Sequence, residues 1–371
     1  MELYLKNKNK GVILIMNYSQ ITLKELKVPE SIPFPKRTDW HIGMIGFGGI
    51  AIGAHAPAYQ NVGWNICAVA DPNSEARRIA QEKYGIQKTY SDFHELINDD
   101  AIEVIDLLTQ PTIREEVVKT SGRAGKPIIT EKPFARSVEE CERMIKIADD
   151  AGIKLAVHQN YRWMKMNYTA HHIIKKGLIG DPFFASIEIF GTQDVDLAGH
   201  EFYSSSEDFL TIQWNNHLAD LLRYWTGKDA DRVFARTGRM KGQNFKGDNL
   251  LCSIADFGDG LTGHILHSEL LRSHLRGTQC RVDGSKGSLK FDFHNNLVIQ
   301  SEILGKESFR LNTKEADFTS SFAGSMGDFL ISIEQDKEPS VSGRRNLATI
   351  KTVSAEHESS MKGGKWINCK G

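Results

Sequence analysis

Glu131 and Lys132 are the residues of this chain best placed to do chemistry, because they end a short apolar run. Residues 127–130 read Pro-Ile-Ile-Thr, which is too short and too β-branched for a helix and is typical of a buried parallel strand. The carboxyl ends of parallel strands face the ligand crevice, so we expect both charged side chains there. Pro133 disfavours the helical region for the preceding residue, which predicts an extended Lys132 at the strand tip. A solvated lysine in a strand-to-helix turn is the simpler interpretation of these residues alone.

A glycine-rich turn earlier in the chain has the spacing of a dinucleotide-binding fingerprint. The motif Gly46-x-Gly48-x-x-Ala51 follows the predicted strand 40–45 and opens a helix. Asp71 ends the next predicted strand, 20 residues after Ala51. The glycines would let the backbone approach a pyrophosphate, and Asp71 would accept hydrogen bonds from ribose hydroxyls and repel a 2′-phosphate. The sequence therefore predicts NAD rather than NADP, and a strand–helix turn without a ligand is the alternative.

The predicted helix 209–226 carries the best candidate for an acid–base residue. Its apolar side chains recur at helical spacing and form one stripe, made by Trp214, Leu218, Leu221, Leu222 and Trp225. Polar side chains fall on the adjoining face: Gln213, His217, Asp220 and Tyr224. We expect the stripe to pack and the polar face to close the crevice, because a Rossmann domain alone supplies no general base. A histidine that only hydrogen-bonds within an interdomain seam is the alternative for His217.

Composition and charge exclude several classes of function. The 371 residues are enough for two domains, each with its own core. The formal net charge is −1 and no basic face stands out, which argues against nucleic acid and membranes as partners. The five cysteines are far apart and free of C-x-x-C pairing, which favours reduced thiols in a cytoplasmic protein over disulfides or a zinc site. No apolar run approaches the ~18 residues of a membrane span.

The order of the predicted elements indicates two architectures in one chain. Strands and helices alternate at first, which predicts a doubly wound parallel Rossmann sheet. From residue 183 onward strands follow one another with one long helix between them, which predicts a mostly antiparallel, open-faced sheet of α+β type. Such a sheet has to cover its free face, so we expect a homodimer or homotetramer through residues 183–303.

The predicted fold class is therefore α/β plus α+β, in three segments. They are an N-terminal arm at 1–39, an NAD-binding Rossmann domain at 40–162, and a substrate-binding and oligomerisation domain at 163–371, whose last helices could pack back on the Rossmann domain. Residues 6–16 mimic a signal peptide, but their apolar part is short and no small-residue cleavage site follows. Residues 10–12 can instead be encoded by a ribosome-binding sequence, so we predict that the natural chain starts at Met16.

At this point the chain resembles the Gfo/Idh/MocA family of glucose–fructose oxidoreductase-like and inositol dehydrogenase-like enzymes, from about Ile42 to the last helix. The Glu-Lys-Pro element between the fingerprint and an antiparallel domain is the specific part of the likeness. The matching stretches are 46–50 (Gly-Phe-Gly-Gly-Ile), Asp71, 109–111 (Thr-Gln-Pro), 124–127 (Ala-Gly-Lys-Pro), 131–133 (Glu-Lys-Pro), 160–163 (Asn-Tyr-Arg-Trp), 177–180 (Gly-Leu-Ile-Gly) and His217-x-x-Asp220.

The resemblance implies NAD-dependent hydride transfer to or from a secondary hydroxyl of a sugar, cyclitol or glycoside. Lys132 then touches the substrate and the nicotinamide ribose, and His217 is the acid–base residue. Gln213 departs from the pattern, because many relatives carry aspartate there, so Asp220 is expected to orient His217 instead. The predicted cofactor-binding residues are Gly46, Phe47, Gly48, Gly49, Ile50, Asp71, Thr109, Gln110, Glu131, Lys132 and Arg162. The predicted substrate-binding residues are Tyr161, Arg162, Trp163, Gln213, Asn216 and Asp220, with packing at the domain junction an equal alternative for 161–163.

Two other functions use the same residues differently. A redox-neutral enzyme of elimination, deglycosylation or epimerisation would recycle tightly bound NAD. An NAD- or sugar-sensing regulator needs neither Lys132 nor His217, so their presence argues against it. His158, His171 and His172 have no acidic or cysteine partner at ligand spacing in the sequence, so no metal is predicted.

Overall fold

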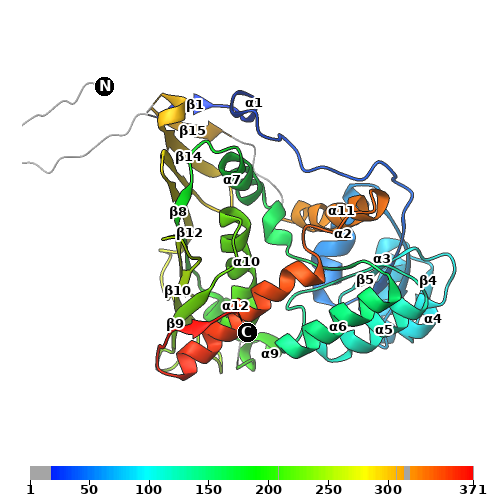
Figure 1. Cartoon of the computed structure of the whole chain (residues 1–371). Helices are drawn as coiled ribbons and strands as arrows, with labels where there is room; N and C mark the ends of the chain where they lie inside the picture. Colours follow the sequence, from blue (N-terminus) through cyan, green and yellow to red (C-terminus); the bar gives the residue numbers. More distant parts are fainter. Residues whose placement is uncertain (1–17, 208, 306, 313–317, 371) are drawn as a thin grey trace, which may run out of the picture.

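Two β-sheets organise the chain in the computed structural model, which describes residues 18–207, 209–305, 307–312 and 318–370. A parallel sheet with helices on both faces lies beside a larger sheet that carries helices on the side facing it (Figure 1). This arrangement confirms the predicted combination of α/β and α+β architecture. The segment that contains the predicted start at Met16 lies outside the described residues.

The parallel sheet has six strands in the order β4-β3-β2-β5-β6-β7, which is the strand order of a Rossmann fold. Its central strands β2 and β5 are nearly continuous apolar runs, as strands covered on both faces must be. The strands are β2 (His41–Ile45), β3 (Asn65–Ala70), β4 (Lys88–Tyr90), β5 (Val104–Leu107), β6 (Ile128–Thr130) and β7 (Leu155–Val157). The connecting helices are η1 (Ala51–His55), α2 (Ala56–Asn61), α3 (Ser74–Tyr84), α4 (Phe93–Ile97), η2 (Pro111–Ile113), α5 (Arg114–Arg123) and α6 (Val138–Ala151).

The second sheet has ten strands in the order β1-β15-β14-β13-β12-β8-β11-β10-β9-β16. Its neighbours are antiparallel except for the pairs β1·β15 and β8·β11. The strands are β1 (Ser19–Ile21), β8 (Pro182–Phe190), β9 (Arg232–Gly238), β10 (Leu250–Asp256), β11 (Thr262–Ser268), β12 (Gly277–Gly284), β13 (Gly287–Phe291), β14 (Asn296–Ser301), β15 (Ser308–Asn312) and β16 (Ile367–Asn368).

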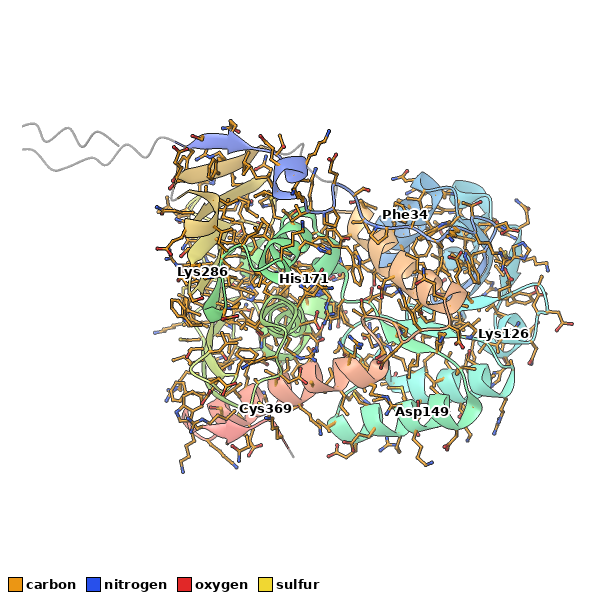
Figure 2. All side chains as sticks on the ribbon, turned by 45° about the horizontal axis from the view of Figure 1, so that its top comes forward. Phe34, Lys126, Asp149, His171, Lys286 and Cys369 are labelled. Atoms are coloured by element: carbon orange, nitrogen blue, oxygen red, sulfur yellow. The ribbon has the colours of Figure 1, made fainter. Side chains whose placement is uncertain are left out.

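Three helices pack on the inner face of the larger sheet, and side chains fill the space between them, where His171 lies (Figure 2). They are α7 (Lys165–Lys175), α10 (Asn215–Thr226) and α12 (Gly343–Met361). Four of the five residues of the predicted apolar stripe are buried in this layer, as expected from their spacing, and Trp214 is partly buried against it. The remaining helices are α1 (Leu23–Leu26), η3 (Asn160–Trp163), α8 (Gln193–Asp196), α9 (Glu201–Ser204), η4 (Phe209–Trp214), η5 (Glu302–Leu304) and α11 (Ser320–Glu334).

Several local expectations differ from the structure. The predicted helix 209–226 begins as the π-helical η4 and becomes α-helical only at Asn215. The predicted N-terminal arm is not a separate segment, because its strand β1 pairs with β15 at one edge of the larger sheet. None of the helices within the described ranges is long and apolar enough to cross a membrane.

Candidate active site

A cavity of about 730 Å³ lies where the carboxyl ends of the parallel strands face α10. This is the crevice in which open parallel sheets bind ligands. Many of the predicted site residues line it: Gly48, Gly49, Ile50, Thr109, Gln110, Glu131, Lys132, Tyr161, Gln213 and His217. Residues from three parts of the sequence therefore meet in one place, as the Rossmann topology requires.

The glycine turn after β2 forms one end of this cavity. Gly46 has φ of +89°, and a Cβ there would lie 3.0 Å from the side chain of Thr109, so only glycine fits without strain. A Cβ at Gly48 or Gly49 would meet nothing within 4 Å, so the turn faces open space. The turn leads directly into the helical segment η1. An open glycine turn before a helix fits the pyrophosphate of a dinucleotide.

Asp71 lies at the end of β3, as predicted, but it is not part of the cavity lining. Its carboxylate accepts hydrogen bonds from the backbone N–H of Phe47 and of Asn73, both at 2.8 Å. A carboxylate has about four acceptor positions, so two backbone donors leave capacity for ribose hydroxyls. Asp71 thus also fixes the glycine turn, a role that the sequence did not indicate. Phe47 is itself buried and packs edge-on against Tyr84.

A buried arginine fixes the backbone of the Glu131-Lys132-Pro133 turn. Arg114, at the start of α5, donates from its guanidinium to the carbonyls of Thr109, Glu131 and Pro133. Burial lowers the pKa of Arg114 to about 10, so it remains a cation at neutral pH. The Lys132–Pro133 peptide bond is cis. The sequence analysis did not identify Arg114, and the available signal was its position three residues after the Thr-Gln-Pro stretch at 109–111.

Lys132 and His217 approach each other across the cavity from the two domains. The Lys132 ammonium group donates to the backbone carbonyl of Gln213 at 3.3 Å. Burial lowers the pKa of Lys132, while Glu131 opposes this shift and Arg114 adds to it. Burial also lowers the pKa of His217 well below 6.5, and Lys132 contributes to that shift. Burial is the main cause of this shift, because the His217 ring is almost completely removed from water.

Tyr161 and Gln213 shape the surroundings of His217. The ring of Tyr161 stacks on the imidazole with centroids 4.0 Å apart and planes at 9°. The Gln213 amide donates to the hydroxyl of Ser206 at 3.2 Å, so it is turned away from the histidine. The Nδ1 atom of His217 is buried and has no hydrogen-bond partner in the described part of the chain. The His217 side chain itself is part of the cavity lining.

Four of the predicted substrate-binding residues lie outside the cavity lining. Arg162 forms a bidentate ion pair with Asp220, both contacts at 2.6 Å, and its guanidinium also lies over the ring of Tyr224. Asp220 therefore does not orient His217, because its carboxylate is committed to Arg162. Trp163 is buried against α11, next to Gly324. Packing at the domain junction, the alternative interpretation, therefore describes Arg162 and Trp163. Arg162 and Asp220 stay paired because a buried charge needs a partner.

Asn216 is the fourth of these residues, and it points into the protein rather than the cavity. Its side-chain oxygen accepts a hydrogen bond from the Gln159 amide at 2.8 Å. Both residues are buried. Asn216 therefore ties α10 to the end of the last Rossmann strand and does not wall the cavity.

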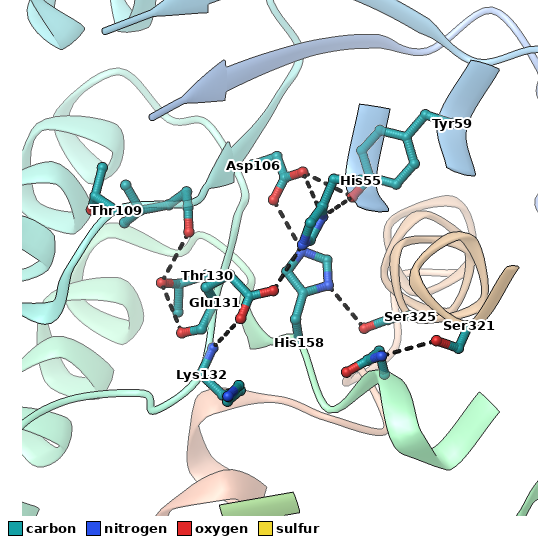
Figure 3. A network of polar contacts seen from close by, with 12 residues as sticks. His55, Tyr59, Asp106, Thr109, Thr130, Glu131, Lys132, His158, Ser321 and Ser325 are labelled. Carbon is teal, nitrogen blue, oxygen red and sulfur yellow. Dashed lines mark hydrogen bonds and ion pairs between the residues drawn. The ribbon is translucent and has the colours of Figure 1, made fainter. Parts of the chain in front are cut away.

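A buried polar network that the sequence did not reveal lies behind Glu131 (Figure 3). His55 is 2.8 Å from Glu131, and His158 is 3.0 Å from Asp106 and 3.0 Å from Ser325. His158 thus has an acidic partner after all, brought to it from another strand. The ligand atoms of His55, Asp106 and His158 lie within 4.8 Å of one another, a spacing that could hold a metal ion. Asp106, a charge inside an apolar strand, was the available signal.

Aromatic side chains from the second domain form the remaining wall of the cavity. They include Phe202, Tyr203 and Phe209 from the segment before α10, with Trp214 on η4 and Phe318 before α11. Trp214 donates its ring N–H to Gln193, another lining residue, at 3.1 Å. The cavity thus combines aromatic rings with converging polar side chains, as small-molecule sites do.

Comparisons with known proteins agree with this geometry. Residues 40–159 match the model of an oxidoreductase family with an NAD-binding Rossmann fold, and residues 168–290 match the model of the GFO/IDH/MocA C-terminal domain. D-apiose dehydrogenase from Paraburkholderia graminis is 25% identical over 324 residues, which cover 83% of this chain and 84% of the relative. Myo-inositol 2-dehydrogenase from Thermotoga maritima is 25% identical over 310 residues, covering 81% and 90%.

A solved structure shares the fold over nearly its whole length. It is an oxidoreductase from Agrobacterium radiobacter in complex with NAD+, L-tartaric acid and magnesium, with a TM-score of 0.83 and 22% identity over 90% of this chain and 99% of that one. The expected family is confirmed, and with it the NAD cofactor. Because the two family models match in order along the two sheets, the chain belongs to the Gfo/Idh/MocA family of oxidoreductases with an NAD-binding Rossmann fold.

Proposed function

We propose that this protein is an NAD-dependent dehydrogenase that oxidises a secondary hydroxyl of a sugar, cyclitol or glycoside. The observation that carries the proposal is the pairing of Lys132 and His217 in one cavity that also opens on the glycine turn. The names of the relatives, which act on D-apiose and myo-inositol, support a sugar-like substrate. The nicotinamide ring of bound NAD supplies the hydride acceptor for such a reaction.

His217 is the proposed general base. Because burial lowers the pKa of this residue well below 6.5, its imidazole is neutral at physiological pH and can accept a proton. As the carbon–hydrogen bond of the alcohol breaks, the hydrogen leaves the carbon as a hydride, the hydroxyl proton passes to the imidazole, and the carbon–oxygen bond becomes a carbonyl. The stacked ring of Tyr161 holds the imidazole plane while this transfer occurs. The imidazolium that results is disfavoured by burial and by Lys132, so it must release its proton before the next turnover.

Lys132 is the proposed electrostatic partner of the same oxygen. Its ammonium group can donate to the developing alkoxide, and fixed donors in a site shielded from water stabilise such charge strongly. The backbone around it is held by Arg114 on one side and by Glu131 on the other. Lys132 is therefore preorganised. The simpler interpretation of the sequence, a solvated lysine in a turn, does not describe this geometry.

The remaining site residues divide between cofactor and substrate. We assign Gly46, Gly48, Gly49, Ile50, Asp71, Thr109 and Gln110 to NAD, with Phe47 contributing its backbone N–H through Asp71. Tyr161 and Gln213 remain as substrate-facing residues, together with the aromatic wall. Aromatic rings pack against the apolar faces of ring-shaped ligands while a few polar groups fix their orientation. The cavity thus suits a cyclic polyol better than an extended acid.

The domain division and assembly are proposals as well. We propose the division into 1–39, 40–162 and 163–371, supported by the six parallel strands, which all lie within 40–162, while α11 packs on the Rossmann helices. The outer face of the larger sheet carries partly exposed apolar side chains, among them Phe184 and Leu266, and no described helix covers them. We infer a homodimer or homotetramer through this face. Five free cysteines support a reducing compartment such as the cytoplasm.

Steady-state oxidation of a sugar panel with NAD, followed by NADH absorbance, tests the proposed activity. The panel starts with D-apiose and myo-inositol. Lys132→Ala and His217→Ala should each lose about 10²–10⁴-fold in rate while still binding NAD. The double variant should lose much less than the product, because the two residues act on one oxygen. Lys290→Ala, which removes an exposed lysine from β13, is the matched control.

One outcome would contradict the proposed mechanism, and another would contradict the proposed substrate class. Near-normal turnover by His217→Ala would move the base to another residue, with Tyr161 the next candidate in the cavity. A wild-type protein that binds NAD but oxidises no member of the panel would contradict the proposed substrate class.

A further inference from the structure

His55 lies between two carboxylates in the interior of the Rossmann domain (Figure 3). Its Nε2 atom is 2.8 Å from a carboxylate oxygen of Glu131. On the other side, Nδ1 is 3.4 Å from Asp106 and 3.1 Å from the hydroxyl of Tyr59. His55 and Asp106 are completely buried, so no water competes for these contacts.

The positions of the hydrogens follow from these contacts. The Tyr59 hydroxyl has one hydrogen and donates it to Asp106 at 2.8 Å, so only its lone pairs face His55. Ionised carboxylates accept hydrogen bonds and cannot donate them. Both ring nitrogens of His55 therefore face acceptors, and each must carry a hydrogen. The ring is an imidazolium ion between two negative charges.

The electrostatics agree with this assignment. Burial by itself would lower the pKa of His55, but Asp106 and Glu131 outweigh it and raise the pKa to about 9. Burial would likewise raise the pKa of Glu131, but His55 holds it at about 2. The groups that face His55 come from every neighbouring element: Tyr59 from α2, Asp106 from β5 and His158 after β7, with the apolar ring of Phe322 from α11.

Glu131 passes this constraint to the reaction site. One of its oxygens is taken by His55, and the other accepts the backbone N–H of Lys132 at 3.0 Å. Both oxygens are thus engaged, so the side chain cannot rotate without breaking a charge-assisted hydrogen bond. Glu131 is also the acidic neighbour that opposes the loss of the Lys132 proton.

We propose that His55 is a positioning residue for the reaction: as a buried imidazolium it fixes the Glu131 carboxylate, and through it the backbone and the ammonium group of Lys132. The part that Lys132 plays in hydride transfer rests on the proposed function above. His55 is not part of the cavity lining. It acts through Glu131, in the way that outer partners orient the ligands of a metal site.

The first test measures the charge of His55 directly. In ¹⁵N-histidine NMR of the wild-type protein without sugar, one buried ring in contact with Tyr59 should carry hydrogens on both nitrogens at neutral pH. It should lose one of them only near pH 9. A neutral His55 ring at pH 7 would overturn the inference. So would a stoichiometric metal ion in the purified protein, because ligation by His55 and His158 requires an unprotonated nitrogen on each.

The second test measures the link to Lys132. In His55→Gln, the backbone amide of Lys132 should exchange its hydrogen about tenfold faster or more, because Glu131 loses its charged partner. His158→Gln is the matched control: it removes another histidine of the same network that touches Asp106 but not Glu131. Its Lys132 amide should change less than about twofold. Unchanged exchange in His55→Gln, or equal effects in both variants, would overturn the inference.

The NMR measurement of His55 and the hydrogen exchange of the Lys132 amide are both independent of the substrate. If the wild-type protein oxidises no sugar, the proposed function fails while the NMR and exchange results still decide the role of His55. With an active substrate, His55→Gln should lower kcat by about 10–100-fold with little change in the KM for NAD. If His55→Gln does not fold, the wild-type NMR measurement alone decides the charge on which the inference depends.

Discussion

Replacing Glu356 with glutamine should make the folded protein less sensitive to alkaline pH. Glu356 lies on α12 behind the active-site helix and is 1% exposed. Its carboxyl group accepts hydrogen bonds from Asn215, two residues before His217, and from Ser253 on β10. Burial raises the pKa of Glu356 from 4.5 to about 7, and the two hydrogen bonds only partly offset this. Among the described residues, no cation is a cause of the Glu356 pKa, so burial is opposed only by these hydrogen bonds.

The sign and size of the effect follow from this pKa. A group whose pKa is raised by folding contributes stability that is fully present below 4.5 and is lost as the pH rises through about 7. The gap between these two values corresponds to about 3 kcal/mol of lost stability at pH 8, and to about 1 kcal/mol at pH 5. Glutamine does not titrate, so Glu356→Gln removes this dependence.

Urea unfolding at pH 5 and at pH 8 measures the difference. From the lower to the higher pH, the stability of Glu356→Gln relative to wild type should improve by about 2 kcal/mol or more. The Ser253 hydroxyl can rotate to accept from the new amide, and any constant offset cancels in the comparison. Glu358→Gln, an exposed glutamate on the same helix, is the control. If the free energies of unfolding of wild type and Glu356→Gln differ by the same amount at both pH values, the assignment of a buried carboxyl with a raised pKa is refuted.

Three further predictions concern the site and the assembly. Because the pKa of His217 is depressed, kcat/KM for oxidation should stay level from pH 8 down to about pH 6; a loss centred near 6.5 would contradict a neutral base. Titration of the apoprotein should show tighter binding of NAD than of NADP, and Asp71→Ala should narrow the preference by about tenfold or more; tighter NADP binding by the wild type would contradict the role of Asp71. Light scattering at micromolar concentration should give a dimer or tetramer, and Leu266→Glu on the outer sheet face should weaken it; a monomeric wild type would rule out this interface.

The local patterns of the sequence were sufficient for the architecture. Alternating strands and helices predicted the parallel sheet, and the glycine turn marked the end at which its cavity opens. The spacing of apolar residues placed His217 beside a buried stripe of α10, and Pro133 marked the strand tip that carries Lys132. These inferences succeed because periodicity and backbone restrictions act over a few residues, which the sequence shows directly.

The partners of the polar side chains were decided only by tertiary structure. Arg162 meets Asp220 across 58 positions of sequence, and His158 meets Asp106 across 52. No local pattern encodes such pairs, so Arg162 and Asp220 were assigned to the ligand although they bind each other. The same holds for charge states, because the pKa values of His55 and His217 depend on how much water the fold removes and which carboxylates it brings close. The sequence could identify His217 as the histidine of the cavity. Only tertiary packing makes His217 neutral and makes the buried His55 a cation.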